Sequence, residues 1–327
     1  MGRFKLSARD VAFVAIFAAL SVIIVKVIPG VPIVGVPEAS IKLDVAVAPI
    51  YGLVVGPYLG FLAAFVGGLI AAGSWFSVLT SFCTAVSALV AGLLTQRNYS
   101  SHSHSIRGWM VAGAILCLLI LGWYMTWVGQ RAPFYPLLHF AALLAILVTR
   151  GWTATSFEEG SEGKEKKWRL KPGYLLCGVL IIVSAYVVTR PYLEEISFLP
   201  YLSLPLYFFG GILILYGLFT EGRAKFAGAI GLASYSGIIA DHMLGNLIFI
   251  NVIGLLIPMG DIEEYFLKPL NLPDVPSLFM YMIPVSTVER IVFTAIATLF
   301  GVGLVLTLRR SGLLPRILQR SKKANDI

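Results

Sequence analysis

Long apolar runs dominate the hydrophobic and polar pattern of this chain. Most of them continue for about 17 to 25 residues, the length that a helix needs to cross about 30 Å of hydrocarbon. The pattern predicts an all-α, polytopic transmembrane helical bundle of about ten spans. These spans are 10–28, 43–56, 57–73, 75–96, 107–129, 133–150, 173–189, 198–220, 224–242 and 280–308. The second and third are joined by Gly56 and Pro57 alone, which predicts a tight helical hairpin, because proline suits the first turn of a helix.

Composition agrees with a membrane protein. Of the 327 residues 58% are hydrophobic and 13% are charged, whereas a soluble domain is about 25% charged. The first apolar run is long enough to span and no small-x-small cleavage site follows it, so we interpret it as a retained helix and not as a signal peptide. The cysteines Cys83, Cys117 and Cys177 lie in apolar runs without CxxC spacing, which favours small buried residues over disulfides or zinc ligands.

Charge is distributed unequally between the two sides of the predicted bundle. Most of the 25 lysines and arginines fall in the N-terminal tail, the C-terminal tail and alternate loops. The opposite loops carry acids such as Glu38 and Glu194. Because positive loops remain in the cytoplasm, the pattern predicts a plasma-membrane protein with both termini cytoplasmic. The net charge of +8 lies in loops and tails, so it does not indicate nucleic acid binding.

The stretch between Leu244 and Met259 is apolar but contains Gly245, Asn246 and Asn251. Three interpretations stay open: a break in the ninth helix, a re-entrant segment, and an extension of the helix. Irregular backbone within a membrane occurs only where protein or a water-filled cavity covers it. An irregular backbone here would therefore indicate a binding site.

Ionisable residues within predicted spans are the main candidates for function, because they are costly in a membrane. They occur as two adjacent pairs on the ninth and tenth spans, the second of which could also be a structural ion pair. An external loop from Pro29 to Pro37 precedes further charged residues, and we interpret it as a lid over an outward-facing pocket. The predicted substrate-binding residues are Glu38, Asp44, Trp75, Asp241, His242, Asn246, Asn251, Glu289 and Arg290.

No pattern typical of an enzyme occurs. There is no Walker A motif, GxSxG or HExxH, so the sequence predicts no catalytic residue, no cofactor and no P-loop ATPase activity. His102 and His104 are too few to form a metal site. The charged run 157–171 is interpreted as a solvated linker.

The N-terminal region resembles a known family. It has an alanine-rich helix with small residues on one face (Ala8, Ala12, Ala15 and Ala19), a proline-bearing loop, the stretch Lys42–Gly60 with its Gly-Pro-x-x-Gly motif, and Gly67-Gly68. Pro284–Arg290 is similar to the same family's last helix. These features resemble the substrate-specific (S) component of energy-coupling-factor (ECF) vitamin transporters.

The resemblance implies a fold and a division of labour. An S component has six helices, binds a micronutrient, and relies on a coupling membrane subunit and ATPase subunits for energy. The alanine face would contact the coupling subunit; packing inside the bundle is the other interpretation of that face. This chain departs from the family by four additional spans. We therefore predict a first half of the core at 1–96, an inserted part at 97–222 with a charged cytoplasmic loop at 151–172, and a second half at 223–327.

Two other functions stay open. One is a stand-alone secondary transporter that uses intramembrane acids for ion coupling, although no inverted repeat is evident. The other is an intramembrane lipid-modifying enzyme, which would need polar residues near the cytoplasmic interface. Here the predicted polar residues gather toward the outer side.

Overall fold

The computed structural model describes residues 7–28, 31–32, 40–96, 107–159, 179 and 221–313. Two predicted spans, 173–189 and 198–220, lie outside the described residues. So do Glu38, His102 and His104, and most of the proline-bearing loop. Predictions that concern these residues stay predictions.

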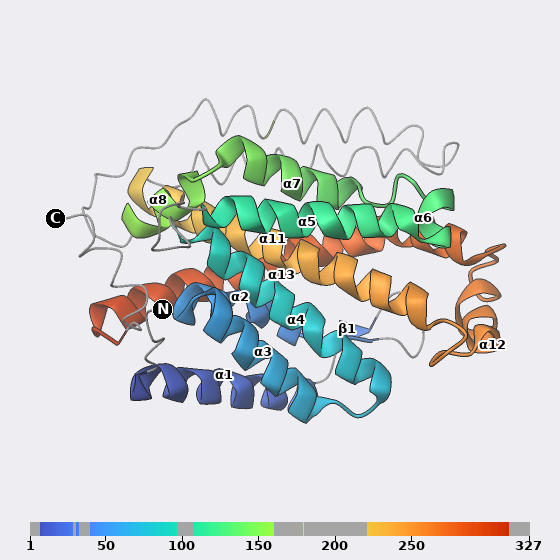
Figure 1. Cartoon of the computed structure of the whole chain (residues 1–327), viewed down its shortest axis with the longest axis horizontal. Coiled ribbons are helices and arrows are strands. Elements are labelled where there is room, and N and C mark those ends of the chain that lie inside the picture. Colours follow the sequence, from blue (N-terminus) through green and yellow to red (C-terminus); the bar gives the residue numbers. More distant parts are fainter. Residues whose placement is uncertain are drawn as a thin grey trace, which may run out of the picture.

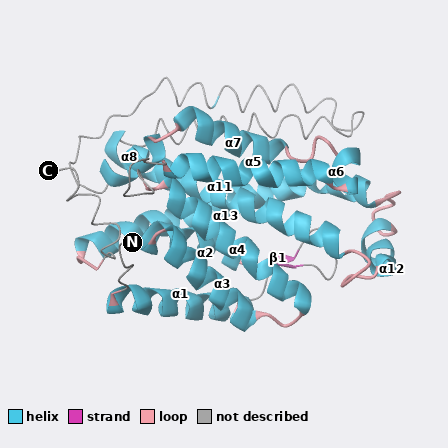
Figure 2. Ribbon diagram, in the orientation of Figure 1, coloured by secondary structure: helices cyan, strands magenta, loops and turns pink. Residues whose placement is uncertain are grey.

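The described chain is helical apart from one short strand pair (Figures 1 and 2). β1 (Val31–Pro32) and β2 (Ser40–Ile41) pair antiparallel. The helices are α1 (Ala8–Val27), α2 (Asp44–Val55), α3 (Pro57–Ala71), α4 (Trp75–Leu94), α5 (Gly108–Met125), α6 (Trp127–Arg131), α7 (Leu137–Thr149), α8 (Trp152–Glu159), α11 (Glu221–Val252), α12 (Met259–Ile262), the π-helix η2 (Glu263–Leu267) and α13 (Val275–Arg310).

Among the described residues, α1, α4, α5 and α13 are long and apolar enough to cross a membrane. A fifth crossing results if α7 and α8 are counted as one span, although the chain bends by 70° between them. The apolar helices α2 and α3 are shorter, with 12 and 15 residues. The chain is thus a multi-pass helical membrane protein, whereas the predicted ten spans are not shown.

The predicted hairpin between α2 and α3 is confirmed. Gly56 has φ of 86°, a left-handed conformation that favours glycine, and Pro57 opens α3. The hairpin packs closely because Gly60 on α3 faces the backbone of Gly52 on α2, while Gly52 itself faces the backbone of Ala88 on α4, so a side chain on either glycine would overlap a neighbouring helix. Gly92 on α4 has the same role toward Pro57. Small residues thus allow the backbones of three helices to come into direct contact. Such contacts are common in membranes, where the hydrophobic effect does not drive helices together.

The central helices of the bundle are α4 and α11. α4 packs against α2, α3 and α11, and α11 also packs against α13. In Figure 1, α1 lies along one edge of the bundle and α5 and α7 cover the opposite side of α11. A guanidinium N–H of Arg9 donates to the carbonyl of Gly312 at 3.1 Å, so the start of α1 and the end of α13 lie at the same end of the bundle.

The ninth predicted span is not broken at Gly245 and Asn246. α11 continues without interruption to Val252, and its 32 residues extend about 48 Å. The irregular backbone begins only at Ile253, and Gly254 there has φ of 81°. Of the three interpretations, the helix extension is therefore the correct one. The asparagine amides do not disturb the helix because each donates a hydrogen bond of its own: Asn246 to the Tyr135 hydroxyl, and Asn251 to the Leu247 carbonyl.

Candidate functional site

Polar side chains from four elements gather between α11 and its neighbours. On α13, Glu289 Oε1 lies 2.7 Å from Arg290 Nη2, and both side chains are largely buried. Asp241 on α11 is also buried, and the charges of Arg290, Glu289 and Asp44 all act on it. We call the set Asp44, Tyr135, His139, Asp241, His242, Asn246, Glu289 and Arg290 the polar layer.

Two carboxyl groups of the polar layer lack ordinary partners. Asp44 lies in the first turn of α2, and its Oδ1 is buried without a hydrogen bond from any described residue. Asp241 is 5% exposed, and within the described part of the chain its side chain forms no hydrogen bond and no ion pair closer than 4 Å. Burial of a charged or polar group without partners is unfavourable. These two carboxyls are therefore the groups most in need of a donor.

A phenol and two imidazoles form the other half of the polar layer. Tyr135, in the turn between α6 and α7, has its hydroxyl 3.2 Å from His242 Nε2 and accepts a 2.9 Å hydrogen bond from Asn246 Nδ2. The rings of His139 on α7 and His242 are stacked, with centroids 5.3 Å apart and planes inclined by 16°. Helices α7 and α11 thus meet through these polar side chains.

The hydrogen-bond pattern limits where the protons of this group lie. The Tyr135 hydroxyl accepts from Asn246 and also lies within hydrogen-bonding reach of Ser286, so its own proton goes either to His242 Nε2 or to Ser286. In the first case His242 Nε2 is an acceptor. A neutral imidazole has one donor and one acceptor nitrogen, so His242 then carries its proton on Nδ1. That nitrogen is buried and no described residue accepts from it. The assignment follows from the network and not from observed hydrogens.

Tyr135 is held in place by aromatic packing. Its ring stacks on Trp123 at a centroid distance of 4.6 Å and meets the edge of Phe279 at 5.1 Å. The Trp123 indole in turn donates a 3.2 Å hydrogen bond to the Ala132 carbonyl. These contacts fix the turn before α7 against both α5 and α13.

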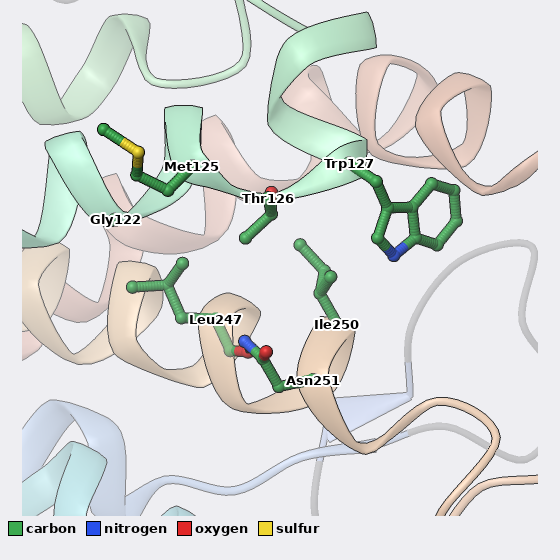
Figure 3. Close-up of a pocket in the computed structure, with 7 residues that line it drawn as sticks. All are labelled: Gly122, Met125, Thr126, Trp127, Leu247, Ile250 and Asn251. Atoms are coloured by element: carbon green, nitrogen blue, oxygen red, sulfur yellow. The ribbon is translucent and has the colours of Figure 1, made fainter.

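The structure brings together six of the nine predicted binding residues: Asp44, Asp241, His242, Asn246, Glu289 and Arg290. Trp75, in contrast, is 77% exposed at the start of α4. Asn251 faces another direction, into a hollow of about 500 Å³ between α11 and the α5–α6 turn (Figure 3). Polar and apolar atoms line this hollow about equally, and Thr126 in its wall uses its hydroxyl to cap α6.

Sequence reasoning missed Tyr135 and His139. Among residues 133–149, His139 is the one residue of the types Asp, Glu, His, Lys and Arg. This isolated histidine in an apolar run was the signal in the sequence that could have identified it. Tyr135 could not be separated from an interfacial aromatic residue by its position alone.

The four alanines predicted to contact a partner lie on the surface of α1. Ala8, Ala12, Ala15 and Ala19 are all exposed. The opposite face of the helix is buried through residues such as Phe17. The alanine face therefore does not pack inside the described bundle.

Comparison with known proteins adds a family to this geometry. Residues 5–132 match the family described as ECF-type riboflavin transporter, S component. No curated protein and no solved structure matches the chain. The matched stretch extends from α1 through α6, so it continues beyond residue 96, where we placed the start of the insertion. Residues 5–132 are therefore similar to the S component of an ECF-type riboflavin transporter, and the match does not extend to the rest of the chain.

Proposed function

We propose that the whole chain is the substrate-binding subunit of an ECF-type importer for a flavin-like micronutrient. The observation that carries this proposal is the match of residues 5–132 to the riboflavin S component. The packing of α1–α4 with α11 and α13 supports a six-helix core. In this proposal the inserted part is the chain between residues 97 and 222, and the whole chain crosses the membrane ten times.

The polar layer suits a ligand that carries both donors and acceptors. Riboflavin has a flat ring system with two carbonyl oxygens around an N–H group, and a sugar-like chain of hydroxyls. The free carboxyl oxygens of Asp44 and Asp241 would accept hydrogen bonds from hydroxyls or from the ring N–H. Arg290 and the imidazoles would donate to carbonyl oxygens. A few polar groups in an otherwise apolar site are typical of ligand binding.

Energy would come from partner subunits. The proposed partners are a coupling membrane subunit, which would pack on the alanine face of α1, and ATPase subunits. Small residues on an exposed helix face allow close approach of a second helix in a membrane. With both termini in the cytoplasm, Asn246 and Tyr135 lie toward the outer side of the membrane, which suits capture from outside.

The test of this proposal combines binding and transport. The full-length chain, purified with and without candidate coupling and ATPase subunits, is mixed with riboflavin, and the loss of flavin fluorescence is measured. We expect submicromolar binding by the chain alone, and ATP-dependent riboflavin uptake into proteoliposomes only with the complete set of subunits. Failure of the chain to bind riboflavin would overturn the ligand assignment.

The buried carboxyls also favour a second candidate, a stand-alone transporter coupled to protons or another cation. The same proteoliposomes distinguish the two. Uptake by the chain alone, driven by a pH gradient and indifferent to ATP, would support the stand-alone transporter and contradict the S-component proposal.

A further inference from the structure

Two residues of the polar layer, Tyr135 and His139, come from the predicted inserted part of the chain, to which no function has been assigned. Tyr135 and His139 lie just beyond the end of the matched stretch at residue 132. They belong to the part of the chain that departs from the six-helix core. Both nevertheless lie against α11, where Tyr135 contacts His242 and Asn246.

Several buried nitrogens of the polar layer have no hydrogen-bond partner among the described residues. His139 is 1% exposed, and neither of its ring nitrogens forms a hydrogen bond of ordinary geometry, although the backbone of Pro136 lies nearby. His242 Nδ1 and Arg290 Nε are likewise buried without an acceptor among the described residues. A buried donor or acceptor that stays unsatisfied destabilises the fold.

These nitrogens are close to one another. The two imidazole rings are stacked at 5.3 Å, and the charge of Arg290 acts on both of them. They therefore form one local set of donors, with His139 contributing a donor or an acceptor according to its tautomer.

Loose packing does not explain the missing partners. Tyr135, the neighbour of both histidines, is enclosed by Trp123 and Phe279, and its hydroxyl is hydrogen-bonded on both sides. A satisfied phenol next to four nitrogens without a partner among the described residues is the arrangement expected of a site that receives its partner from outside the described chain.

We propose that α7 forms one wall of the ligand site and that His139, together with His242 and Arg290, binds an oxygen acceptor of the ligand. This inference rests on the proposed function and extends it to the inserted helices. Tyr135 is then a positioning residue that fixes the orientation and tautomer of His242. If the ligand is a flavin, the oxygen acceptor is either a carbonyl oxygen of the ring or a phosphate oxygen of flavin mononucleotide.

Binding assays on the full-length protein test the inference with three probes: riboflavin, flavin mononucleotide and lumiflavin, which lacks the hydroxylated chain. Three variants are compared with the wild type: His139→Phe, His139→Gln and Phe140→Ala. Phe140 is the matched control, because it is the next residue on α7 but is 44% exposed. Unfolding temperature is measured without ligand for each protein.

Affinity and stability should change in opposite directions. We expect His139→Phe to weaken riboflavin binding about tenfold or more, while its unfolding temperature stays equal or rises, because an apolar ring replaces unsatisfied nitrogens. His139→Gln should recover part of the affinity, and Phe140→Ala should bind as the wild type does. Lumiflavin binding that is equally sensitive to His139→Phe assigns the acceptor to the ring. Sensitivity confined to flavin mononucleotide assigns it to the phosphate.

Different failures have different meanings. If the wild type binds the probes and His139→Phe binds riboflavin and flavin mononucleotide as well as the wild type does, α7 is not a wall of the site and the inference is wrong. If His139→Phe instead lowers both affinity and unfolding temperature, and His139→Gln does not restore affinity, the histidine is structural. If the wild type binds none of the three probes, the proposed flavin ligand fails first, and the inference fails with it.

Discussion

Asp274 shows how one carboxyl group starts the longest described helix. It lies at the N-cap of α13, and its Oδ1 accepts hydrogen bonds from the Ser277 backbone N–H at 2.9 Å and from the Ser277 hydroxyl at 2.6 Å. These bonds favour the ionised form, so the pKa of Asp274 lies below its ordinary value. We expect Asp274→Ala to lower the free energy of unfolding by about 1 kcal/mol and Asp274→Asn to have little effect at neutral pH.

The pH dependence of this cap has a defined sign. A carboxyl whose pKa is lowered by folding stabilises the protein above its unfolded pKa, near 4, and loses that contribution as pH falls through the lowered value. The stability difference between wild type and Asp274→Ala, measured by thermal unfolding in detergent, should therefore shrink as the solution is acidified below about pH 4. A difference that stays constant under acid would show that the charge of Asp274 does not contribute.

A second interaction at the residue scale attaches α1 to the bundle. The hydroxyls of Ser21 and Tyr51 lie 2.9 Å apart in a buried position, and Phe17 stacks on the Tyr51 ring at 4.7 Å. Tyr51→Phe alone leaves the Ser21 hydroxyl buried without its partner and should cost about 1–2 kcal/mol. Adding Ser21→Ala to Tyr51→Phe should cost little more or restore stability, because no unsatisfied hydroxyl remains. Fully additive effects in this double-mutant cycle would show that the two hydroxyls do not interact.

At the scale of elements, the close packing of α2, α3 and α4 depends on glycine. A side chain at Gly52 would overlap the backbone carbonyl of Ala88 on α4, and backbone cannot move aside as a flexible side chain can. We expect Gly52→Ala to destabilise the bundle by about 3 kcal/mol or more and to reduce the yield of folded protein in size-exclusion chromatography.

Gly303 on α13 is the matched control for this prediction. It is also helical, but nothing lies within 4 Å of a Cβ built there. Gly303→Ala should be neutral or stabilise the helix by up to about 1 kcal/mol. Equal behaviour of the two variants would mean that helix propensity, and not helix contact, decides the outcome.

The same elements show how far the sequence could predict the fold. Runs of apolar residues and the Gly56-Pro57 junction were enough to predict the bounds of α1 to α5 within a few residues. Membrane thickness sets the length of each run and proline opens a helix, and both signals can be read from the local sequence. The continuity of α11 through Gly245 and Asn246 was left open by the sequence, because the partner of the Asn246 amide is Tyr135, more than a hundred residues away along the chain. The bend between α7 and α8 was missed for a related reason: α8 packs against α11, which is a tertiary contact.

The candidate site was predictable to a similar extent. Charged residues within apolar runs stand out because membranes disfavour them, and six of the nine predicted residues lie in one layer. Trp75 and Asn251 lie away from this layer, and their predicted role in binding stays a prediction, because the sequence does not show which helix face meets a neighbour. Tyr135 and His139 were missed because their importance comes from their neighbours on α11 and not from their own sequence context.

At the scale of the whole molecule, α1 leaves one face uncovered at an edge of the described bundle. α1 contacts the rest through α2 and α3, and Figure 1 places it at the border of the bundle. The buried residues Phe17, Ser21 and Ile24 share one face of α1. At 100° per residue, the alanine stripe lies on the opposite face. This geometry leaves the stripe accessible either to lipid or to a partner helix.

Replacement of one alanine distinguishes lipid from partner. Ala15→Trp adds a large side chain to the exposed face, where no described helix packs, so folding and riboflavin binding should remain as in the wild type. If the coupling subunit packs on this face, ATP-dependent uptake in proteoliposomes should fall at least tenfold, and the ATPase subunits should no longer co-purify. Ile16→Trp is the control, because Ile16 is 59% exposed but points about 100° away around the helix. Unimpaired uptake by Ala15→Trp would assign the alanine face to lipid, whereas loss of riboflavin binding with intact co-purification would assign α1 to the ligand site.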